Sequence, residues 1–408
     1  MSAVGAARER AKPTSPRRVD RRAMATLSAG HLCTDIGQGS IPALLPFLIA
    51  RDHLSYATAS ALVLAATVSS SVIQPLFGHV SDRRSLPWLM PLGPLLGGIG
   101  VGLIGLAPNY GLAFAAVLLS GTGVAAFHPE GSRFANYVSG DRRSSGMSLF
   151  SVGGNIGFAL GPAIITPSVL ALGLHGTLVV IAPTALMAAV LAHELGRLKR
   201  FRPLSPRTRD QPSSPADWGP FTLLGLVIAL RSFVYFGMVT FLPLYFVHVL
   251  HAGRGAGGAA LTAMLVGGAA GTLIGGPLAD RFGRKRVLVC SMAVLPPLIG
   301  ALLLSGPVLA TLFAALAGAA TIATFAVTIV MGQEMLPGRI GVASGVTIGL
   351  SIGLGGVGAP LLGVLADADG LRAVFELLLA FPVAALLVGL LLPARPRASW
   401  PAEATVAE

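Results

Sequence analysis

Polar side chains occur at helical spacing inside an apolar segment near the start of this chain. His31, Asp35 and Gln38 stand at positions i, i+4 and i+7, so a helix that begins near residue 23 carries all three on one stripe. A charge in an apolar interior costs about 2.5–3.5 kcal/mol even on the mildest scale, which makes such a group a candidate for function. A carboxylate in this place can act as a proton relay, loading a proton from one side and releasing it to the other.

A second cluster, His128, Glu130 and Arg133, lies in the apolar segment that begins near residue 111. A rise of about 1.5 Å per residue places Asp35 roughly 18 Å along its segment and His128 roughly 15 Å from the end of the other, which runs in the opposite direction. The clusters therefore share a depth. If the segments are neighbours, we predict one polar nest in which these residues and His31 couple proton movement and Arg133 compensates a carboxylate. The alternative is a structural ion pair, with neutral histidines bonding across helices.

The second half of the chain holds one cation inside an apolar segment, Arg231, with Tyr235 one helical turn further on. A guanidinium presents a fork suited to phosphonate or carboxylate, so Arg231 is a candidate for binding an anionic substrate. The alternative is that Arg231 snorkels to the surface or pairs with Glu334. Gln38 and Asn155 complete the predicted substrate-binding set, although the glycines around Asn155 also indicate close helix packing.

The composition shows which elements must position these residues. Of the 408 residues, 11% are charged, against about 25% in an average globular protein, 53% are hydrophobic, and the mean hydropathy is +0.76. The apolar runs can span a hydrocarbon core of about 30 Å, which indicates an integral membrane protein. Cys33 and Cys290 lie far apart inside such runs, which argues against a disulfide framework or a cysteine metal site. Twelve apolar segments start near residues 23, 56, 88, 111, 144, 175, 219, 255, 287, 307, 339 and 371.

Lys and Arg gather in alternate connections between these segments. If both termini are cytoplasmic, 24 of the 29 lie on the cytoplasmic side, and the outside loops hold Arg51, Arg254 and Arg372. This bias is the positive-inside rule. It explains the net charge of +12 by orientation and by contact with anionic membrane lipids, so no nucleic-acid partner is expected. Asp367 and Asp369, near the outer surface, are expected to be solvated.

A stretch rich in Pro, Arg and Ser, residues 196–218, divides the chain into two parts that repeat one another. The pattern G-x-x-x-D-R occurs at residues 78–83 and again 198 residues later at 276–281, and Pro162 and Pro360 have the same separation. Duplicated halves of this kind are found in transporters. The predicted organisation is a basic cytoplasmic N-tail (1–22), an N-terminal six-helix half (23–195), a cytoplasmic linker (196–218), a C-terminal six-helix half (219–393) and a cytoplasmic C-tail (394–408).

The run from Gly276 to Arg286 resembles the loop motif of the major facilitator superfamily. The resemblance implies an all-α integral membrane fold with twelve transmembrane helices in two six-helix halves. It also implies a gate at the cytoplasmic mouth, where Asp280 caps a helix of the other half and favours an outward-facing state. The first copy is degenerate, since residues 84–86 replace the second glycine and its basic tail. The residues for which the resemblance implies gating are Asp82, Arg83, Gly276, Asp280, Arg281, Gly283 and Arg284.

Several features of the first half resemble a narrower group, the fosmidomycin-resistance efflux proteins. They are residues 31–35, residues 127–130 with Arg133, and the stretch from Gly153 to Pro162. The last part of that stretch also resembles the fifth-span motif of drug/proton antiporters, which favours export. Val117 stands where those antiporters have a basic residue in the fourth span, so a mechanism that uses that arginine is not available here unless Arg133 replaces it.

These observations predict a secondary transporter, not an enzyme, that exports a small drug-like or anionic compound by proton antiport and alternating access. Its expected partners are the substrate, protons and membrane lipids, and we expect a monomer in a bacterial cytoplasmic (inner) membrane. No cofactor is expected, and the chain has no G-x-x-x-x-G-K-S/T loop for a nucleotide. One alternative is proton-coupled uptake of a nutrient or metabolite. The other is a membrane metalloenzyme with His31, Asp35, His128 and Glu130 as ligands, although no H-E-x-x-H motif is present.

Overall fold

The computed structural model describes residues 19–83, 86–140, 143–201, 216–336 and 339–393. Within these ranges all regular structure is helical, mostly α with short 3₁₀ and π segments, which confirms the all-α class. The physical reason is the bilayer: a helix satisfies its backbone donors and acceptors inside its own segment, where no water can do so.

The helices before the linker are α1 (Arg21–Asp52), α2 (Tyr56–Arg83), α3 (Leu89–Leu106), α4 (Tyr110–Val138), α5 (Arg143–Leu172), the 3₁₀ helix η1 (Gly173–Val180) and α6 (Ile181–Leu198). The helices after it are α7 (Trp218–His248), α8 (Gly253–Phe282), α9 (Arg284–Leu303), α10 (Pro307–Ala323), α11 (Phe325–Met335), α12 (Ile340–Gly349), the π segment η2 (Leu350–Leu354), α13 (Gly355–Asp369) and α14 (Leu371–Leu391).

Ten stretches of the described residues are long and apolar enough to cross a membrane. One of them, Gly146–Leu198, runs through α5, η1 and α6, and α2 is not among the ten. The expected count of twelve spans therefore stays a prediction.

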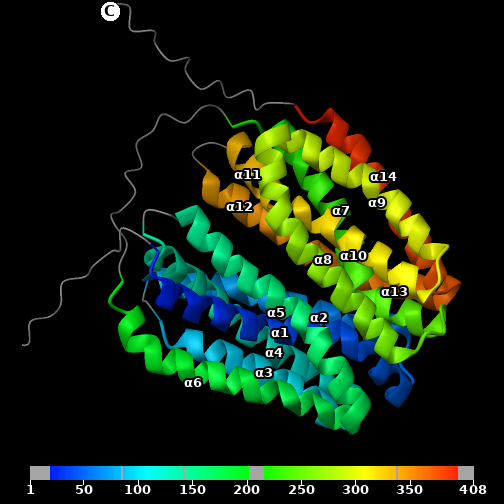
Figure 1. Cartoon of the computed structure of the whole chain (residues 1–408), viewed down its shortest axis with the longest axis horizontal. Helices are drawn as coiled ribbons and strands as arrows, with labels where there is room; N and C mark the ends of the chain where they lie inside the picture. Colours follow the sequence, from blue (N-terminus) through cyan, green and yellow to red (C-terminus); the bar gives the residue numbers. More distant parts are fainter. Residues whose placement is uncertain (1–18, 84–85, 141–142, 202–215, 337–338, 394–408) are drawn as a thin grey trace, which may run out of the picture.

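The helices form two groups, which we call the N-terminal group (α1–α6) and the C-terminal group (α7–α14) (Figure 1). In the first group α1 packs on α5 and α4, and α3 packs on α4 and α6. In the second group α8 packs on α10, and α14 packs on α7 and α9. The groups meet where α2 contacts α13, α5 contacts α8 and α1 contacts α7. The predicted domain boundaries, with the first half ending at residue 195 and the second beginning at residue 219, stay predictions. Helix α6 ends at Leu198 and helix α7 begins at Trp218.

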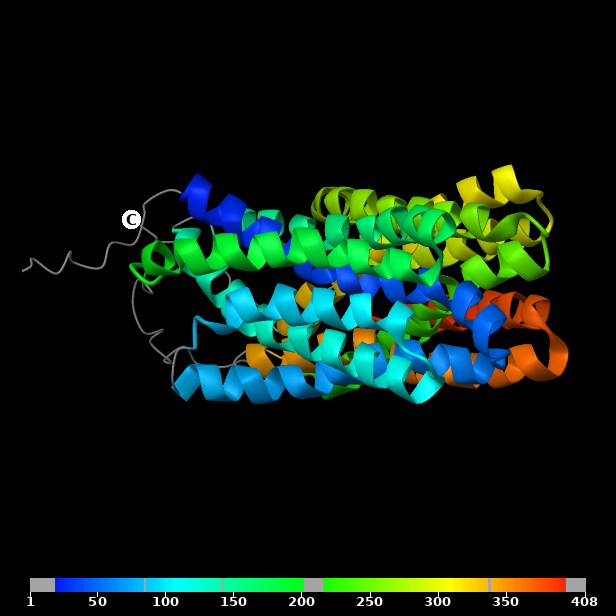
Figure 2. The same cartoon turned by 90° about the horizontal axis from the view of Figure 1, so that it is seen from below.

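The two ends of the bundle are named here by the helices that begin or end there. At the inner end α1 begins and α6 ends, as Figure 2 shows, and Arg22 Nη2 lies 2.5 Å from Glu194 Oε1. At the outer end α1 gives way to α2, and α7 to α8. The two names follow the orientation expected from the positive charges, which stays a prediction.

Helices α1 and α5 lie in backbone contact because small residues face each other. A Cβ on Gly161 of α5 would lie 2.5 Å from the carbonyl carbon of Gly39 on α1. Such close approach is how membrane helices gain packing without a hydrophobic driving force between them. It brings the polar stripe of α1 alongside the backbone of α5.

Two interruptions of regular α-helix lie next to α7. Helix α10 ends at Ala323 and α11 begins at Phe325, and the π segment η2 stands between α12 and α13. Both α11 and η2 contact α7. Local π geometry takes backbone groups off the regular hydrogen-bond ladder and is frequent at functional sites.

Candidate functional site

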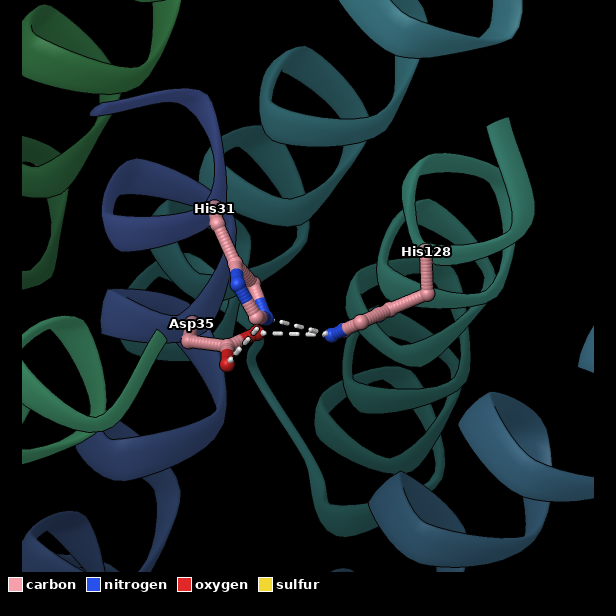
Figure 3. Close-up of side chains that lie close together, drawn as sticks. All are labelled: His31, Asp35 and His128. Atoms are coloured by element: carbon pink, nitrogen blue, oxygen red, sulfur yellow. Dashed lines mark hydrogen bonds and ion pairs between the residues drawn. The ribbon is translucent and has the colours of Figure 1, made fainter. Parts of the chain in front are cut away.

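Three polar side chains of α1 and α4 point toward one another (Figure 3). His31 and Asp35 stand one turn apart on α1, with His31 Nε2 3.3 Å from Asp35 Oδ2. His128 reaches across from α4 and places its Nε2 3.0 Å from His31 Nε2 and 3.5 Å from Asp35 Oδ1. The predicted approach of the two segments is thus present for these three residues, which we call the trio.

Hydrogen-bond partners determine the tautomers of both histidines. His31 Nδ1 lies 2.8 Å from the carbonyl oxygen of Phe150, and His128 Nδ1 lies 2.8 Å from that of Val124. A carbonyl oxygen only accepts, so each Nδ1 donates, and a neutral ring is left with a lone pair on Nε2. Two such lone pairs then face each other across 3.0 Å. The arrangement is complete when one ring is protonated and donates through Nε2.

The carboxylate of the trio also lacks a donor. Asp35 Oδ1 is buried and accepts no hydrogen bond from the described residues. His31 is 8% exposed and Asp35 is 9% exposed, so water cannot fully take the place of a donor. With both rings neutral, the two Nε2 atoms and the Asp35 carboxylate are therefore acceptors that face one another, and a proton added to either Nε2 would supply a donor between them.

Aromatic rings and one glycine hold the trio in place. The rings of Phe150 and Phe127 stack on His31, with centroids 4.2 Å and 6.0 Å away. On the α5 side, a Cβ on Gly154 would lie 2.5 Å from His31 Nε2 and 2.8 Å from Asp35 Oδ2. Gly154 and the Phe150 carbonyl were not among the predicted site residues. A glycine and a backbone carbonyl have no functional side chain that a sequence pattern could reveal. From the sequence, Gly154 was interpreted as a helix-packing residue.

Glu130 and Arg133 form a separate pair. Glu130 is fully buried, and both its carboxylate oxygens accept hydrogen bonds from Arg133 Nη2. Glu130 Oε1 also accepts from the backbone N–H of Leu86, at 2.9 Å, in the connection before α3. The predicted single nest is thus two neighbouring arrangements, because positions 128 and 130 point in different directions from one helix.

Arg231 is buried in α7, at 3% exposure, among hydroxyl groups. Its Nη1 lies 3.1 Å from Thr324 Oγ1 and its Nη2 lies 3.0 Å from Ser351 Oγ. Thr324 stands at the α10–α11 interruption and Ser351 lies in η2. The suggested pairing with Glu334 is wrong, because Glu334 pairs with Arg284. Within the described part of the chain no carboxylate lies within 4.0 Å of the Arg231 guanidinium.

The other predicted substrate-binding residues differ in their surroundings. Tyr235 is half-buried one turn from Arg231, and its ring lies edge-on to that of Phe236. Gln38 is half-buried and makes no hydrogen bond with the described residues. Asn155 Nδ2 donates to Thr272 Oγ1 at 3.3 Å and so joins α5 to α8, and its role in substrate binding stays a prediction.

The residues of the expected gate are only partly described. Asp82 and Arg83 lie in the last turn of α2, and their side chains are outside the described residues. Asp280 is exposed, and no ion pair joins it to a described residue, so the expected capping contact stays a prediction.

The second copy of the motif ends α8 and begins α9. Gly276 is half-buried, and Gly283 ends α8 at φ 91°, a conformation that favours glycine. Arg281 is exposed, with its guanidinium 5.2 Å from the ring centroid of Phe282. Arg284 begins α9 and pairs with Glu334 of the same group.

Comparison with known families decides the identity of the fold. The sequence-family model described as Major Facilitator Superfamily matches this chain over residues 27–257 and 225–407. The chain belongs to the major facilitator superfamily. The chain is therefore an integral membrane transporter of a small molecule and not an enzyme, and the metalloenzyme alternative is wrong. Although the trio places three potential ligand atoms within 4.8 Å of one another, the fourth suggested ligand, Glu130, is bound to Arg133 and Leu86.

Two curated members of this superfamily cover nearly the whole chain. An uncharacterised transporter of Bacillus subtilis, YfnC, is 32% identical over 369 residues, which are 88% of this chain and 90% of the relative. The fosmidomycin resistance protein of Escherichia coli is 30% identical over 384 residues, 92% of this chain and 94% of the relative. The predicted resemblance to the fosmidomycin-resistance group is thus confirmed.

Solved structures of major facilitator proteins share the fold. A bacterial homologue of the human lysosomal transporter Spinster, in an inward-facing and unoccupied conformation, matches with a TM-score of 0.73 and 17% identity, over 92% of this chain and 97% of that one. The nucleoside transporter NupG matches with a TM-score of 0.72 and 15% identity, over 90% and 99% of the two chains.

Proposed function

We propose that this transporter exports a small anionic compound in exchange for protons, and that the trio binds the coupled proton. The observation that carries the proposal is the pair of Nε2 lone pairs facing each other at 3.0 Å beside a buried carboxylate oxygen without a donor. Such a site stabilises a bound proton and loses that stabilisation when the proton leaves. A transporter that alternates between two sides can use this change to drive its substrate.

The proton role of the trio is tested in proteoliposomes with fosmidomycin as the probe. We expect Asp35→Asn to abolish accumulation driven by a pH gradient while exchange of labelled for unlabelled probe continues, because the substrate site is retained. Asp369→Asn, an exposed carboxylate near the outer surface, is the matched control and should transport normally. Normal pH-driven accumulation by Asp35→Asn would show that the trio is not the coupling site.

We propose that Arg231, with Tyr235 and Gln38, binds the anionic part of the substrate. Support comes from a buried guanidinium whose described partners are the neutral hydroxyls of Thr324 and Ser351. A buried charge is stable only when it is paired or well hydrogen-bonded, so an entering oxyanion would supply the missing counter-charge.

Export is favoured by the similarity to a protein named for resistance to fosmidomycin. The second candidate is uptake by the same machinery. Inside-out vesicles with an acidic interior should accumulate labelled fosmidomycin if the protein exports it. Accumulation confined to right-side-out vesicles with an acidic exterior would instead favour proton-coupled uptake.

We propose that the protein lies as a monomer in a bacterial cytoplasmic membrane with both termini in the cytoplasm. The distribution of 24 of 29 Lys and Arg on one side supports this orientation, and the same residues can contact anionic lipid. A tag at either terminus should resist protease added outside spheroplasts. Digestion of a terminal tag in intact spheroplasts would contradict the orientation.

For the remaining predicted residues we propose supporting roles. Glu130 and Arg133 stabilise the connection before α3 through Leu86, and so position α4, rather than binding the coupled proton themselves. Asp280 and the motif around it are proposed to form the inner gate in the conformation in which the inner end is closed. We expect Glu130→Gln to lower thermal stability and transport together, whereas Asp35→Asn should affect coupling with little change in stability.

A further inference from the structure

Asp367 is exposed, as the sequence indicates, and its carboxylate also contacts the other helix group. Its carboxylate, in the last turn of α13, accepts hydrogen bonds from two backbone N–H groups of α2. Tyr56 N donates to Oδ1 at 2.7 Å, and Ala57 N donates to Oδ2 at 3.0 Å. Helix α13 belongs to the C-terminal group and α2 to the N-terminal group, so these bonds cross between the groups.

The first turn of α2 requires this partner. The first backbone N–H groups of a helix have no acceptor inside the helix. Ser55 acts as a local cap and its Oγ accepts from Thr58 N, at 3.1 Å, which leaves the N–H groups of Tyr56 and Ala57 to Asp367. The first turn of α2 holds no acidic residue, so Asp367 also supplies the negative charge that the positive end of a helix favours.

Close packing holds Asp367 in this position. Gly363 stands one turn before Asp367 on α13, and a Cβ there would lie 2.6 Å from Ala57 Cα. Two ring contacts lie at the same end: the Tyr56 ring is 5.9 Å from that of His248, and the Arg254 guanidinium is 5.2 Å from the ring of Phe47. Each joins the N-terminal group to the C-terminal group.

The inner end is different. Among the described residues its ion pairs are Arg22 with Glu194, Arg197 with Asp20 and with Glu194, and Arg284 with Glu334, and each pair lies within one group. Among the described residues, the Asp367 hydrogen bonds and the two ring contacts thus join the groups at the outer end.

We propose that Asp367 is a latch that stabilises the conformation closed at the outer end, and that it must release α2 before the outer end opens. Its carboxylate acts on the conformational equilibrium alone, because it lies at the end of the bundle, away from the trio and Arg231. The latch rests on the two conformations of the alternating access proposed above. Its test needs no substrate, so a failure of the latch can be distinguished from a failure of the proposed substrate.

The test uses cysteine reporters in a background with Cys33→Ser and Cys290→Ser. Thr166→Cys reports on the outer end, because Thr166 of α5 is buried against Gly258 of α8. Gly276→Cys reports on the inner end. It lies one turn beyond Thr272, which contacts α5, and no atom lies within 4 Å of a Cβ at this position.

In purified protein, Asp367→Ala should raise the rate of maleimide labelling at Thr166→Cys about fivefold, the effect expected from losing a helix cap, and lower the rate at Gly276→Cys. Asp369→Ala removes the same charge two residues away, from an exposed side chain that makes no hydrogen bond with a described residue, and should change neither rate. Asp367→Glu keeps the carboxylate, so its two labelling rates should lie between those of the wild type and those of Asp367→Ala. Unchanged labelling in Asp367→Ala would overturn the proposal, as would faster labelling at both reporters, which indicates general loosening.

Discussion

Two acceptor nitrogens 3.0 Å apart repel each other unless a hydrogen lies between them. In the trio, backbone carbonyls on the far side of each ring prevent either histidine from turning its hydrogen inward. A proton taken up by either Nε2 would remove this repulsion, and for this reason we propose the trio as the site of the coupled proton. The same reasoning distinguishes Glu130, which already has donors from Arg133 and Leu86 and is complete without a proton.

Gly154 should be essential at this site because a methyl group there occupies the space of the trio. A Cβ would lie 2.5 Å from His31 Nε2, closer than van der Waals contact allows. We expect Gly154→Ala to lower pH-driven transport about tenfold or more, since small displacements of reacting groups have large effects on rate. Gly349→Ala, with open space around its Cβ, is the control for replacing a helical glycine. Wild-type transport by Gly154→Ala would contradict the described geometry.

Arg231 should require its planar fork and not merely a positive charge. Two of its nitrogens are directed to Thr324 and Ser351, a geometry that a lysine ammonium cannot reproduce. We expect Arg231→Lys to raise the KM for fosmidomycin about tenfold with a smaller change in kcat, and Arg231→Gln to abolish binding. Arg372→Lys, in an exposed pair with Glu376, should be neutral. If Arg231→Gln retains the wild-type KM, the substrate anion binds elsewhere.

At the scale of the helices, the position of the trio depends on how closely α1 and α5 approach. Gly161 and Gly39 bring the two backbones together, and Gly154 continues this approach beside His31 and Asp35. The surroundings of Arg231 depend instead on interruptions of the helices. The break at Thr324 and the π segment with Ser351 place two hydroxyl groups at positions that regular helices would not reach. One site is thus made by close packing and the other by local irregularity.

Enlarging the α1–α5 contact should separate the two helices. In Gly161→Val the added carbons collide with the Gly39 backbone, and overpacking of this kind costs about 1–3 kcal/mol. We expect the apparent Tm in detergent to fall by several degrees and pH-driven transport to fall with it. Gly196→Val on α6, where no atom lies within 4 Å of the Cβ, should leave both unchanged. Equal Tm values for the two variants would contradict the tight packing described.

On the scale of the whole molecule, the described contacts between the two helix groups include several at the outer end of the bundle, whereas the described ion pairs at the inner end do not cross between the groups. Cross-group contacts at the outer end include Asp367 with the first turn of α2 and Gly258 with Thr166. Ion pairs of the described residues at the inner end stay within their groups. A molecule with this asymmetry can rock about its centre, which is what alternating access requires.

A cross-link at the outer end should therefore stop transport reversibly. A Cβ on Gly258 would lie 2.8 Å from Thr166 Cβ, near enough for a disulfide after a small adjustment. In the background without Cys33 and Cys290, we expect oxidised Thr166→Cys/Gly258→Cys to lose transport and a reducing agent to restore it. Each single cysteine variant should be insensitive to oxidation. Transport by the fully cross-linked protein would show that the outer end need not open.

The sequence by itself determined the membrane location, the all-α class and the superfamily. These follow from long apolar runs and a repeated loop motif, which are local properties that the bilayer converts into helices whatever their neighbours. The polar stripe of α1 was also readable, because helical periodicity places His31 and Asp35 on one face.

Which polar groups meet was decided by the tertiary structure. His128 joins Asp35 while Glu130 turns to Leu86, Asn155 joins Thr272, and Asp367 caps a helix more than three hundred residues earlier. These pairings depend on the rotation of each helix about its axis and on the distance between neighbours. Small residues and helix interruptions set both quantities through contacts between distant segments, and no pattern within a single segment records them.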